Sequence, residues 1–256
     1  MVRLCATVSC LDIGNTISHF GRYKNGTLVS EKNIPTAILV ENTIEILEGL
    51  EFEKKRISYC SVVPKAEKAL LEYSKLNNIE LFNLDHNSCG NLPINYPNPC
   101  EIGQDRIANS IAAFHTIELP CIVIDVGTAT TFDIISPRGG YEGGVITPGP
   151  QGLLDFLNQN TALLPTVKAD QEFLHSAIGK NTKDAMLIGS KIGYKSMTLG
   201  ILVKLIDEIE ELLGKKPTIV KTGGGSSKLA IKNCLHHPDL TILGLALAFQ
   251  LNSPII

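Results

Sequence analysis

Short apolar runs alternate with polar loops along this chain, and two of the loops have the same form. Residues 121–124 (CIVI) are typical of a buried strand, and they lead into residues 125–131 (DVGTATT). The first apolar run of the chain ends in residues 12–16 (DIGNT). Each loop is followed by another apolar run and a turn, at Asn25-Gly26 in the first copy and Gly139-Gly140 in the second. Asn-Gly between apolar runs is a strong hairpin signal, so the pattern predicts two strand–loop–strand hairpins about half a chain apart.

Further strands and helices are predicted between and after these hairpins. Apolar runs predict strands at residues 57–63, 79–84 and 218–221. Helical spacing of apolar residues predicts helices at 41–50, 65–76, from Asp105 onward, 153–158, 185–209, 227–233 and 243–251. Alternating strands and helices indicate an α/β protein. We therefore expect two similar halves, residues 1–118 and 119–256, with a ligand cleft between them.

Composition limits the possible partners. The 256 residues are 44% apolar and 19% charged, with a net charge of -3, which favours neither nucleic acid nor an anionic membrane. No apolar run is long enough to span a bilayer, and Asp12 interrupts the first apolar run, which argues against a signal peptide. Seven cysteines without a Cys-x-x-Cys pair suggest free thiols in a reducing compartment. We expect a cytoplasmic protein that binds neither membranes nor nucleic acid.

The two repeated loops are suited to a phosphorylated ligand and a cation. A carboxylate at a strand end can hold a cation, while glycine backbone and threonine hydroxyls can donate to phosphate oxygens. A plain hairpin turn is the alternative, because Asp and Asn often satisfy backbone groups there. Two copies at matching places favour the ligand interpretation. No P-loop motif is present, and the glycine run at 222–227 could hold a base or phosphate or be a simple turn.

Residues 103–106 (GQDR) stand at a predicted helix start. Asp105 there is either an N-cap residue or a general base beside an arginine that binds a substrate anion. The chemistry alone leaves both open. The Asn- and Pro-rich loop at 87–100, which contains Tyr96, makes a nearby pocket plausible.

Several segments together resemble the type III pantothenate kinases, a family within the superfamily of acetate and sugar kinases, heat-shock chaperones and actin. The matching segments lie in order over nearly the whole chain, and 103–131 is the most specific of them. They are residues 12–16, 61–64, 96–99, 103–109, 125–131, 143–149, 161–165, 178–182 and 222–224.

The resemblance implies a duplicated ribonuclease-H-like fold with ATP between the halves. It implies transfer of the ATP γ-phosphoryl group to the 4′-hydroxyl of pantothenate, the first step of coenzyme A biosynthesis, with Asp105 as the base. Pantothenate would be held by Tyr96, Gly103, Gln104, Asp105, Arg106 and Thr182. ATP would be contacted by Asp12, Ile13, Gly14, Asn15, Thr16, Ile17, Ser18, His19 and Thr128. Mg²⁺ would accompany ATP near Asp12, Asp125 would ligate a monovalent cation (K⁺ or NH₄⁺), and the protein would be a homodimer with Thr182 near the subunit interface.

The chain departs from the family pattern in a few places away from Asp105. These are Pro150, residues 190–192, residues 225–227 and a slightly long N-terminal segment. They bear on pocket detail and dimer packing rather than on the reaction.

Two other functions share parts of this pattern. A nucleotide-binding regulatory protein of the same family would have little use for Asp105, Arg106 and Asp125 together. A phosphotransferase or phosphohydrolase of the superfamily with another substrate would keep the two loops, but would not need Tyr96 or residues 103–106.

Overall fold

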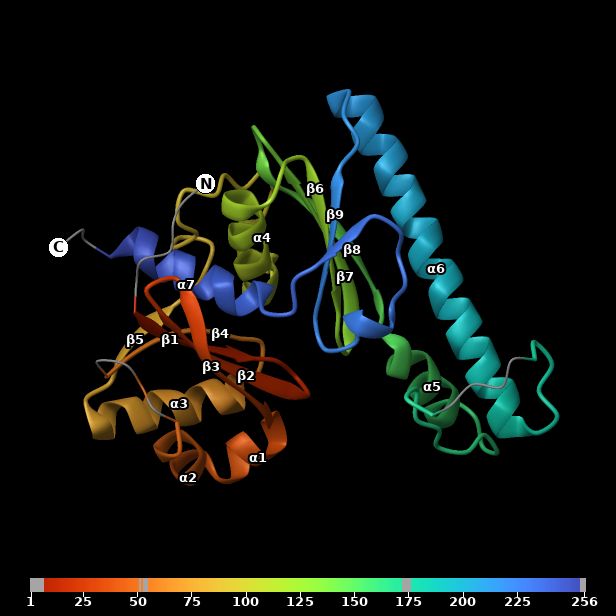
Figure 1. Cartoon of the computed structure of the whole chain (residues 1–256). Coiled ribbons are helices and arrows are strands. Elements are labelled where there is room, and N and C mark those ends of the chain that lie inside the picture. The colour runs from red at the N-terminus through yellow and green to blue at the C-terminus, as the bar shows by residue number, and fades with distance from the viewer. Residues whose placement is uncertain (1–6, 51, 53–54, 172–175, 254–256) are drawn as a thin grey trace. The chain divides into compact units, whose positions relative to one another are not determined.

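The strands of the protein form two five-stranded sheets with the same strand order (Figure 1). The structure is a computed structural model that describes residues 7–50, 52, 55–171 and 176–253. The first sheet has the order β3-β2-β1-β4-β5 and consists of β1 (Val8–Ile13), β2 (Ile17–Lys24), β3 (Thr27–Pro35), β4 (Arg56–Ser61) and β5 (Glu80–Asn83). The second has the order β8-β7-β6-β9-β10 and consists of β6 (Cys121–Val126), β7 (Ala129–Ser136), β8 (Gly140–Pro148), β9 (Thr218–Thr222) and β10 (Cys234–His236). The predicted duplication is thus confirmed at the level of sheet topology.

Matching strands carry the two loop aspartates. Asp12 is the last residue but one of β1, and Asp125 is the last residue but one of β6. In the first sheet β1 pairs antiparallel with β2 and parallel with β4, so Asp12 lies between His19 and Cys60. The hairpin turn between β2 and β3 has positive φ at Asn25 (50°) and Gly26 (80°), as the Asn-Gly pair predicts.

Helices cover both faces of the first sheet (Figure 1). On one face lie α1 (Thr36–Glu41), α2 (Thr43–Glu48) and α3 (Pro64–Asn77), and the core beneath them includes Leu11, Ile57 and Leu70. On the other face lie α4 (Gln104–Thr116) and α7 (Leu240–Asn252). The remaining helices are α5 (Pro150–Gln159) and α6 (Thr182–Leu213), which pack on each other around Leu154 and Met186.

The last helix of the chain joins the first sheet. The Ser58 hydroxyl donates to the Leu245 carbonyl (2.9 Å), and Thr241 Oγ1 donates to Asn109 Oδ1 (2.8 Å). Gly244 crosses α4 so closely that a Cβ there would overlap the Ala108 carbonyl. Because of this helix, the end of the chain helps to position α4.

The chain forms two compact units that are not continuous in sequence. Unit 1 runs to Cys121 and adds Asp133–Gly143 and the chain from Asp239 onward; unit 2 comprises Ile122–Phe132 and Gly144–Pro238. The predicted division into residues 1–118 and 119–256 concerns the duplicated sheets, and as a domain boundary it stays a prediction.

Three predicted helices differ from the structure. The helix expected at 41–50 is the shorter α2 (Thr43–Glu48), and a second short helix, α1 (Thr36–Glu41), precedes it without having been predicted. The helix expected at 227–233 is only a 3-10 turn, Ser226–Lys228. The segment 185–209 lies within a longer continuous helix, and its Gly189, Gly193 and Gly200 cause neither breaks nor close packing within the chain, since a Cβ at each would meet nothing within 4 Å.

No helix among the described residues combines the length and the apolar character needed to cross a membrane.

Candidate active site

The loop after β1 is held in place by a small buried hydrogen-bond network. Thr36 Oγ1 donates to the Gly14 carbonyl (2.7 Å) and lies 2.9 Å from the Ser18 hydroxyl, which is buried. The backbone N–H of Thr36 donates to the Thr16 carbonyl (2.9 Å). Asn15 and Thr16 are exposed at the tip of the loop. The side chains of Asn15 and Thr16 are therefore open to solvent, whereas the Thr16 carbonyl and the Ser18 hydroxyl bond within the fold.

The other residues of this predicted ATP segment line the hairpin. Ile13 is fully buried in the core beside Asp12, and Ile17 begins β2. His19 Nδ1 lies 2.7 Å from Asn33 Oδ1 on the neighbouring strand β3.

Asp12 is a carboxylate in a strongly desolvated place. Its pKa is raised to about 7 by burial, the largest cause, and by the negative charge of Asp105, while a hydrogen bond from Cys60 opposes the rise. The Cys60 thiol donates to Asp12 Oδ1 (3.3 Å). The electrostatic coupling with Asp105 means that both carboxylates belong to one site in unit 1. An added cation would relieve their mutual repulsion.

The first turn of α4 carries Asp105 and Arg106. Gly103 is its N-cap residue and has no side chain to cap it, so the N-cap interpretation of Asp105 is wrong. A Cβ on Gly103 would lie 2.6 Å from Asp105 Oδ1, so glycine makes room for the carboxylate. Gln104 Oε1 accepts from the backbone N–H of Ser61 (2.8 Å), which ties this turn to the end of β4.

Asp105 keeps a raised pKa despite two stabilising contacts. Burial raises the pKa, while the backbone N–H of Arg106, which donates to Asp105 Oδ1 (2.8 Å), and the Arg106 charge lower it. The desolvation effect is the largest of these. A carboxylate with a raised pKa is a better proton acceptor than an ordinary aspartate.

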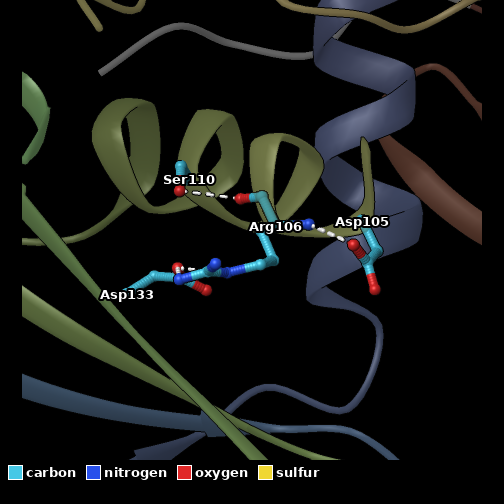
Figure 2. Close-up of polar contacts among 4 residues, drawn as sticks. All are labelled: Asp105, Arg106, Ser110 and Asp133. Carbon is cyan, nitrogen blue, oxygen red and sulfur yellow. Dashed lines mark hydrogen bonds and ion pairs between the residues drawn. The ribbon is translucent and has the colours of Figure 1, made fainter. Parts of the chain in front are cut away.

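Arg106 points away from Asp105 and toward β7 (Figure 2). Its Nε donates to Oδ1 of Asp133 (2.8 Å), and Nη2 lies 2.7 Å from the same oxygen. The Asp133 side chain is fully buried and that of Arg106 is 12% exposed. Nη2 is buried and makes no hydrogen bond with any described residue, so its contact with Asp133 is an ion-pair contact only.

Aromatic rings surround this guanidinium. Arg106 Cζ lies 5.8 Å from the centre of the Tyr141 ring, a cation–π distance. Tyr96 packs edge-on against Tyr141 with ring centres 5.9 Å apart. The Tyr141 hydroxyl also bonds to Asp133. Tyr96 and residues 103–106, predicted to share a pocket, are thus linked through Tyr141 within unit 1.

Asp125 and Thr128 lie in unit 2, at the end of β6. Gly223 (φ 85°) packs so tightly here that a Cβ would overlap the Asp125 carboxylate, so the loop after β9 closes around it. Thr128 is exposed, and its carbonyl accepts from the backbone N–H of Gly149 (3.0 Å). The predicted glycine run at 222–227 and the predicted cation ligand are therefore neighbours.

Thr182 is the first residue of α6 in unit 2 and is exposed. The preceding Asn181 caps this helix by accepting from the backbone N–H of Asp184 (2.9 Å). Thr182 itself therefore does not cap the helix. Pro150, which departs from the family pattern, stands in the first turn of α5, where proline is favourable.

Sequence reasoning missed Asp133, Tyr141 and Cys60. A signal for Asp133 was available, because it is the single charged residue in the strand Ala129–Ser136. A charged residue in a strand without other charges is rarely buried unless it has a partner. Nothing local marked Tyr141 or Cys60.

Comparison with known proteins assigns the family. The family model of type III pantothenate kinase matches residues 10–204. The type III pantothenate kinase of Methylacidiphilum infernorum is 38% identical over 219 residues, covering 84% of this chain and 77% of that protein. That of Akkermansia muciniphila is 36% identical over 251 residues, covering 96% and 99%. This chain belongs to the type III pantothenate kinases.

Solved structures agree with the fold. A Campylobacter jejuni protein named for the Baf family of transcriptional activators has a TM-score of 0.59 at 21% identity, covering 96% of this chain and 98% of its own. A Sinorhizobium meliloti protein named as a 2-dehydro-3-deoxygalactonokinase has a TM-score of 0.57 at 15% identity, covering 97% and 98%. At such identities the likeness concerns the fold alone, and it agrees with the duplicated ribonuclease-H-like architecture of the kinase superfamily.

Proposed function

We propose that Asp105 and Arg106 divide the work on pantothenate between them. As a member of its family the protein phosphorylates pantothenate with ATP, at the 4′-hydroxyl, in the first step of coenzyme A biosynthesis. Asp105 accepts the hydroxyl proton, and Arg106 binds the pantothenate carboxylate. The observation that carries this proposal is that the two side chains diverge from one helical turn, leaving a carboxylate with a raised pKa and a guanidinium whose side chain is still 12% exposed (Figure 2).

The chemistry of phosphoryl transfer fits this division. Such reactions depend on in-line positioning and on neutralising charge, and they need little covalent help from the protein. Tyr96, Gly103 and Gln104 complete the pantothenate pocket. The tie from Gln104 to Ser61 and the small Gly103 support this, because both fix the first turn of α4 where the hydroxyl must approach Asp105.

The loop from Asp12 to His19 binds ATP, with Thr128 contributing from the second sheet. The exposed tip at Asn15 and Thr16 supports this role. Mg²⁺, which enters with ATP and neutralises phosphate oxygens, fits Asp12, because a carboxylate is a hard oxygen ligand. Its pKa of about 7 reflects burial and, after that, the Asp105 charge, and a bound cation would offset both.

Asp125 is the ligand of a monovalent cation, K⁺ or NH₄⁺. The close approach of the Gly223 backbone to this carboxylate supports the proposal, because it brings the glycine loop after β9 to the strand end where a carboxylate can hold a cation. The cation would supply positive charge near the phosphates.

The protein acts as a homodimer in which Thr182 closes the pantothenate pocket near the interface. An exposed small-residue face on α6, formed by Gly189, Gly193, Ser196, Gly200 and Val203, supports this proposal. These residues repeat at steps of three and four and so lie on one side of the helix. Small residues allow a second helix to approach closely. A cytoplasmic location without nucleic acid or membrane partners completes the proposal, on the grounds of composition.

The test is ADP release by purified protein with ATP and Mg²⁺, with and without pantothenate, in sodium and then in potassium buffer. We expect release only when pantothenate is present, and faster release in potassium. Release without pantothenate would favour a phosphohydrolase. Absence of release in every buffer, with ATP still bound, would favour the regulatory protein.

A further inference from the structure

The buried carboxylate of Asp133 is the strongest feature of the site that has no assigned role. It comes from β7, and it meets α4 through Arg106, 27 residues earlier in the sequence. No part of the side chain reaches the surface, so it cannot take part in the reaction by touching a substrate from solvent.

Two groups converge on this carboxylate from different elements. Arg106 approaches with Nε at 2.8 Å and Nη2 at 2.7 Å, both to Oδ1. The Tyr141 hydroxyl donates to it from β8, while the Tyr141 ring lies against the guanidinium. Asp133 therefore fixes both the direction of the Arg106 side chain and the ring on which the guanidinium rests.

Stability alone does not account for this arrangement. Burial raises the pKa of Asp133 to about 6, although Arg106 and Tyr141 both lower it. Desolvation thus outweighs the favourable contacts, as is common for buried ion pairs, which often contribute little net stability. What the pair does provide is a defined geometry.

We propose that Asp133 is a positioning residue that draws the Arg106 guanidinium away from Asp105. The inference rests on the proposed function of Asp105 and Arg106. The Arg106 charge already lowers the pKa of Asp105, so the long arginine side chain lies within electrostatic reach of this carboxylate and, without a partner on β7, would be free to turn toward it. In such a pair, the guanidinium would neutralise the carboxylate that acts as the base, and pantothenate would lose the group that binds its anion. With Asp133 in place, Asp105 stays available for the hydroxyl proton, and the Arg106 guanidinium is held in one direction for the pantothenate carboxylate (Figure 2).

A double-mutant cycle, in which a second substitution should restore the kcat that the first one lowers, tests this inference. Asp133→Asn, Arg106→Met and the double variant are compared by steady-state kinetics for pantothenate and for ATP. In Asp133→Asn, the freed arginine captures Asp105, so we expect kcat to fall about tenfold or more and the pantothenate KM to rise about tenfold. In the double variant no arginine is left to capture the base, so kcat should recover to within about threefold of Arg106→Met alone. Only an effect that passes through Arg106 predicts such recovery.

Three further measurements exclude a general structural effect. The ATP KM should stay within about twofold of the wild type in Asp133→Asn, since Asp12 and its loop are untouched. Ser110→Ala serves as the matched control: its hydroxyl donates to the Arg106 carbonyl (2.7 Å) in the same buried region, and its loss should leave the pantothenate KM unchanged. If Asp133→Asn folds poorly, Tyr141→Phe removes one donor to Asp133 but keeps the ring, and a smaller shift in the same direction is expected.

The outcomes separate this inference from the proposed function. If Asp133→Asn lowers kcat equally with and without Arg106, or leaves both constants at wild-type values, Asp133 is not a positioning residue. If instead Arg106→Met itself leaves the pantothenate KM unchanged, the assignment of Arg106 to pantothenate fails first. A wild-type protein without pantothenate-dependent turnover would remove the basis of both.

Discussion

At the scale of single residues, Asp105 combines a raised pKa with freedom from side-chain partners in its own turn. Asp105→Asn keeps the shape and the backbone contact but cannot accept a proton. We expect kcat to fall about 10²- to 10⁴-fold, while ATP and pantothenate still bind by calorimetry. Turnover near the wild-type value would remove Asp105 as the base.

The pH dependence of the wild type follows from the same residue. The base must be ionised to work, and burial raises the pKa of Asp105 above the ordinary aspartate range. Activity should therefore be lost on the acid side at a higher pH than for an exposed aspartate, with kcat/KM falling as pH drops through the raised pKa. Wild-type profiles of kcat/KM against pH check this expectation. An acid limb at the ordinary value near 3.9 would contradict it.

Asp125 gives a second prediction at this scale. Asp125→Ala removes the carboxylate that the Gly223 backbone encloses, so stimulation by potassium should disappear while a low potassium-independent rate remains. Rates measured over a potassium series in a sodium background check this. An unchanged potassium response would place the cation elsewhere.

At the scale of elements, α6 shows how glycine can mislead a sequence pattern. Three glycines in one helix predict breaks or close packing, yet the helix runs unbroken from Thr182 to Leu213. Its glycines instead lie on one exposed side of the helix, where no other described part of the chain packs against them. Close packing, if it occurs there, must come from a second copy of the chain.

Gly193→Ala distinguishes a solvent-exposed face from a dimer interface. On a solvated helix, the change should stabilise the protein by about 0.8–1 kcal/mol, because alanine has the higher helix propensity. At a tight interface, the added methyl should instead weaken the dimer about tenfold or more. We expect the second outcome, measured by sedimentation equilibrium over a concentration series. Lys195→Ala, exposed but outside the small-residue face, is the control and should leave the dimer intact.

At the scale of the whole molecule, unit 1 is completed by the end of the chain. α7 crosses α4 at Gly244, where a side chain would overlap the Ala108 carbonyl. Gly244→Ala should therefore destabilise the protein by about 1–3 kcal/mol through overpacking, which corresponds to about 2–4 °C in Tm per kcal/mol for a protein of this size. Thermal unfolding measures it. Gly224→Ala, where a Cβ meets nothing within 4 Å, is the matched control and should leave Tm nearly unchanged.

The same variant links stability to activity. Since α4 carries Asp105 and Arg106, a shift of its axis should also lower kcat for pantothenate. A variant with reduced Tm but wild-type kcat would mean that α4 keeps its place independently of α7.

The sequence determined the parts of this protein that depend on near neighbours. Apolar runs ending in Asp-x-Gly loops predicted the strands and the duplicated topology, because a strand and its following turn are specified by a few adjacent residues. The helices at 65–76 and 243–251 were predicted for the same reason. The family motifs also pointed to Asp12, Asp105 and Asp125.

Tertiary structure decided the contacts between distant residues. Asp133 meets Arg106, Ser58 meets Leu245, and Cys60 meets Asp12 only because the chain path brings separate strands and helices together. Periodicity cannot reveal such pairs, since each residue alone fits its strand or helix equally well without its partner. The Arg106 side chain bonds to a carboxylate on β7, so the direction in which it points follows from the fold and not from the motif.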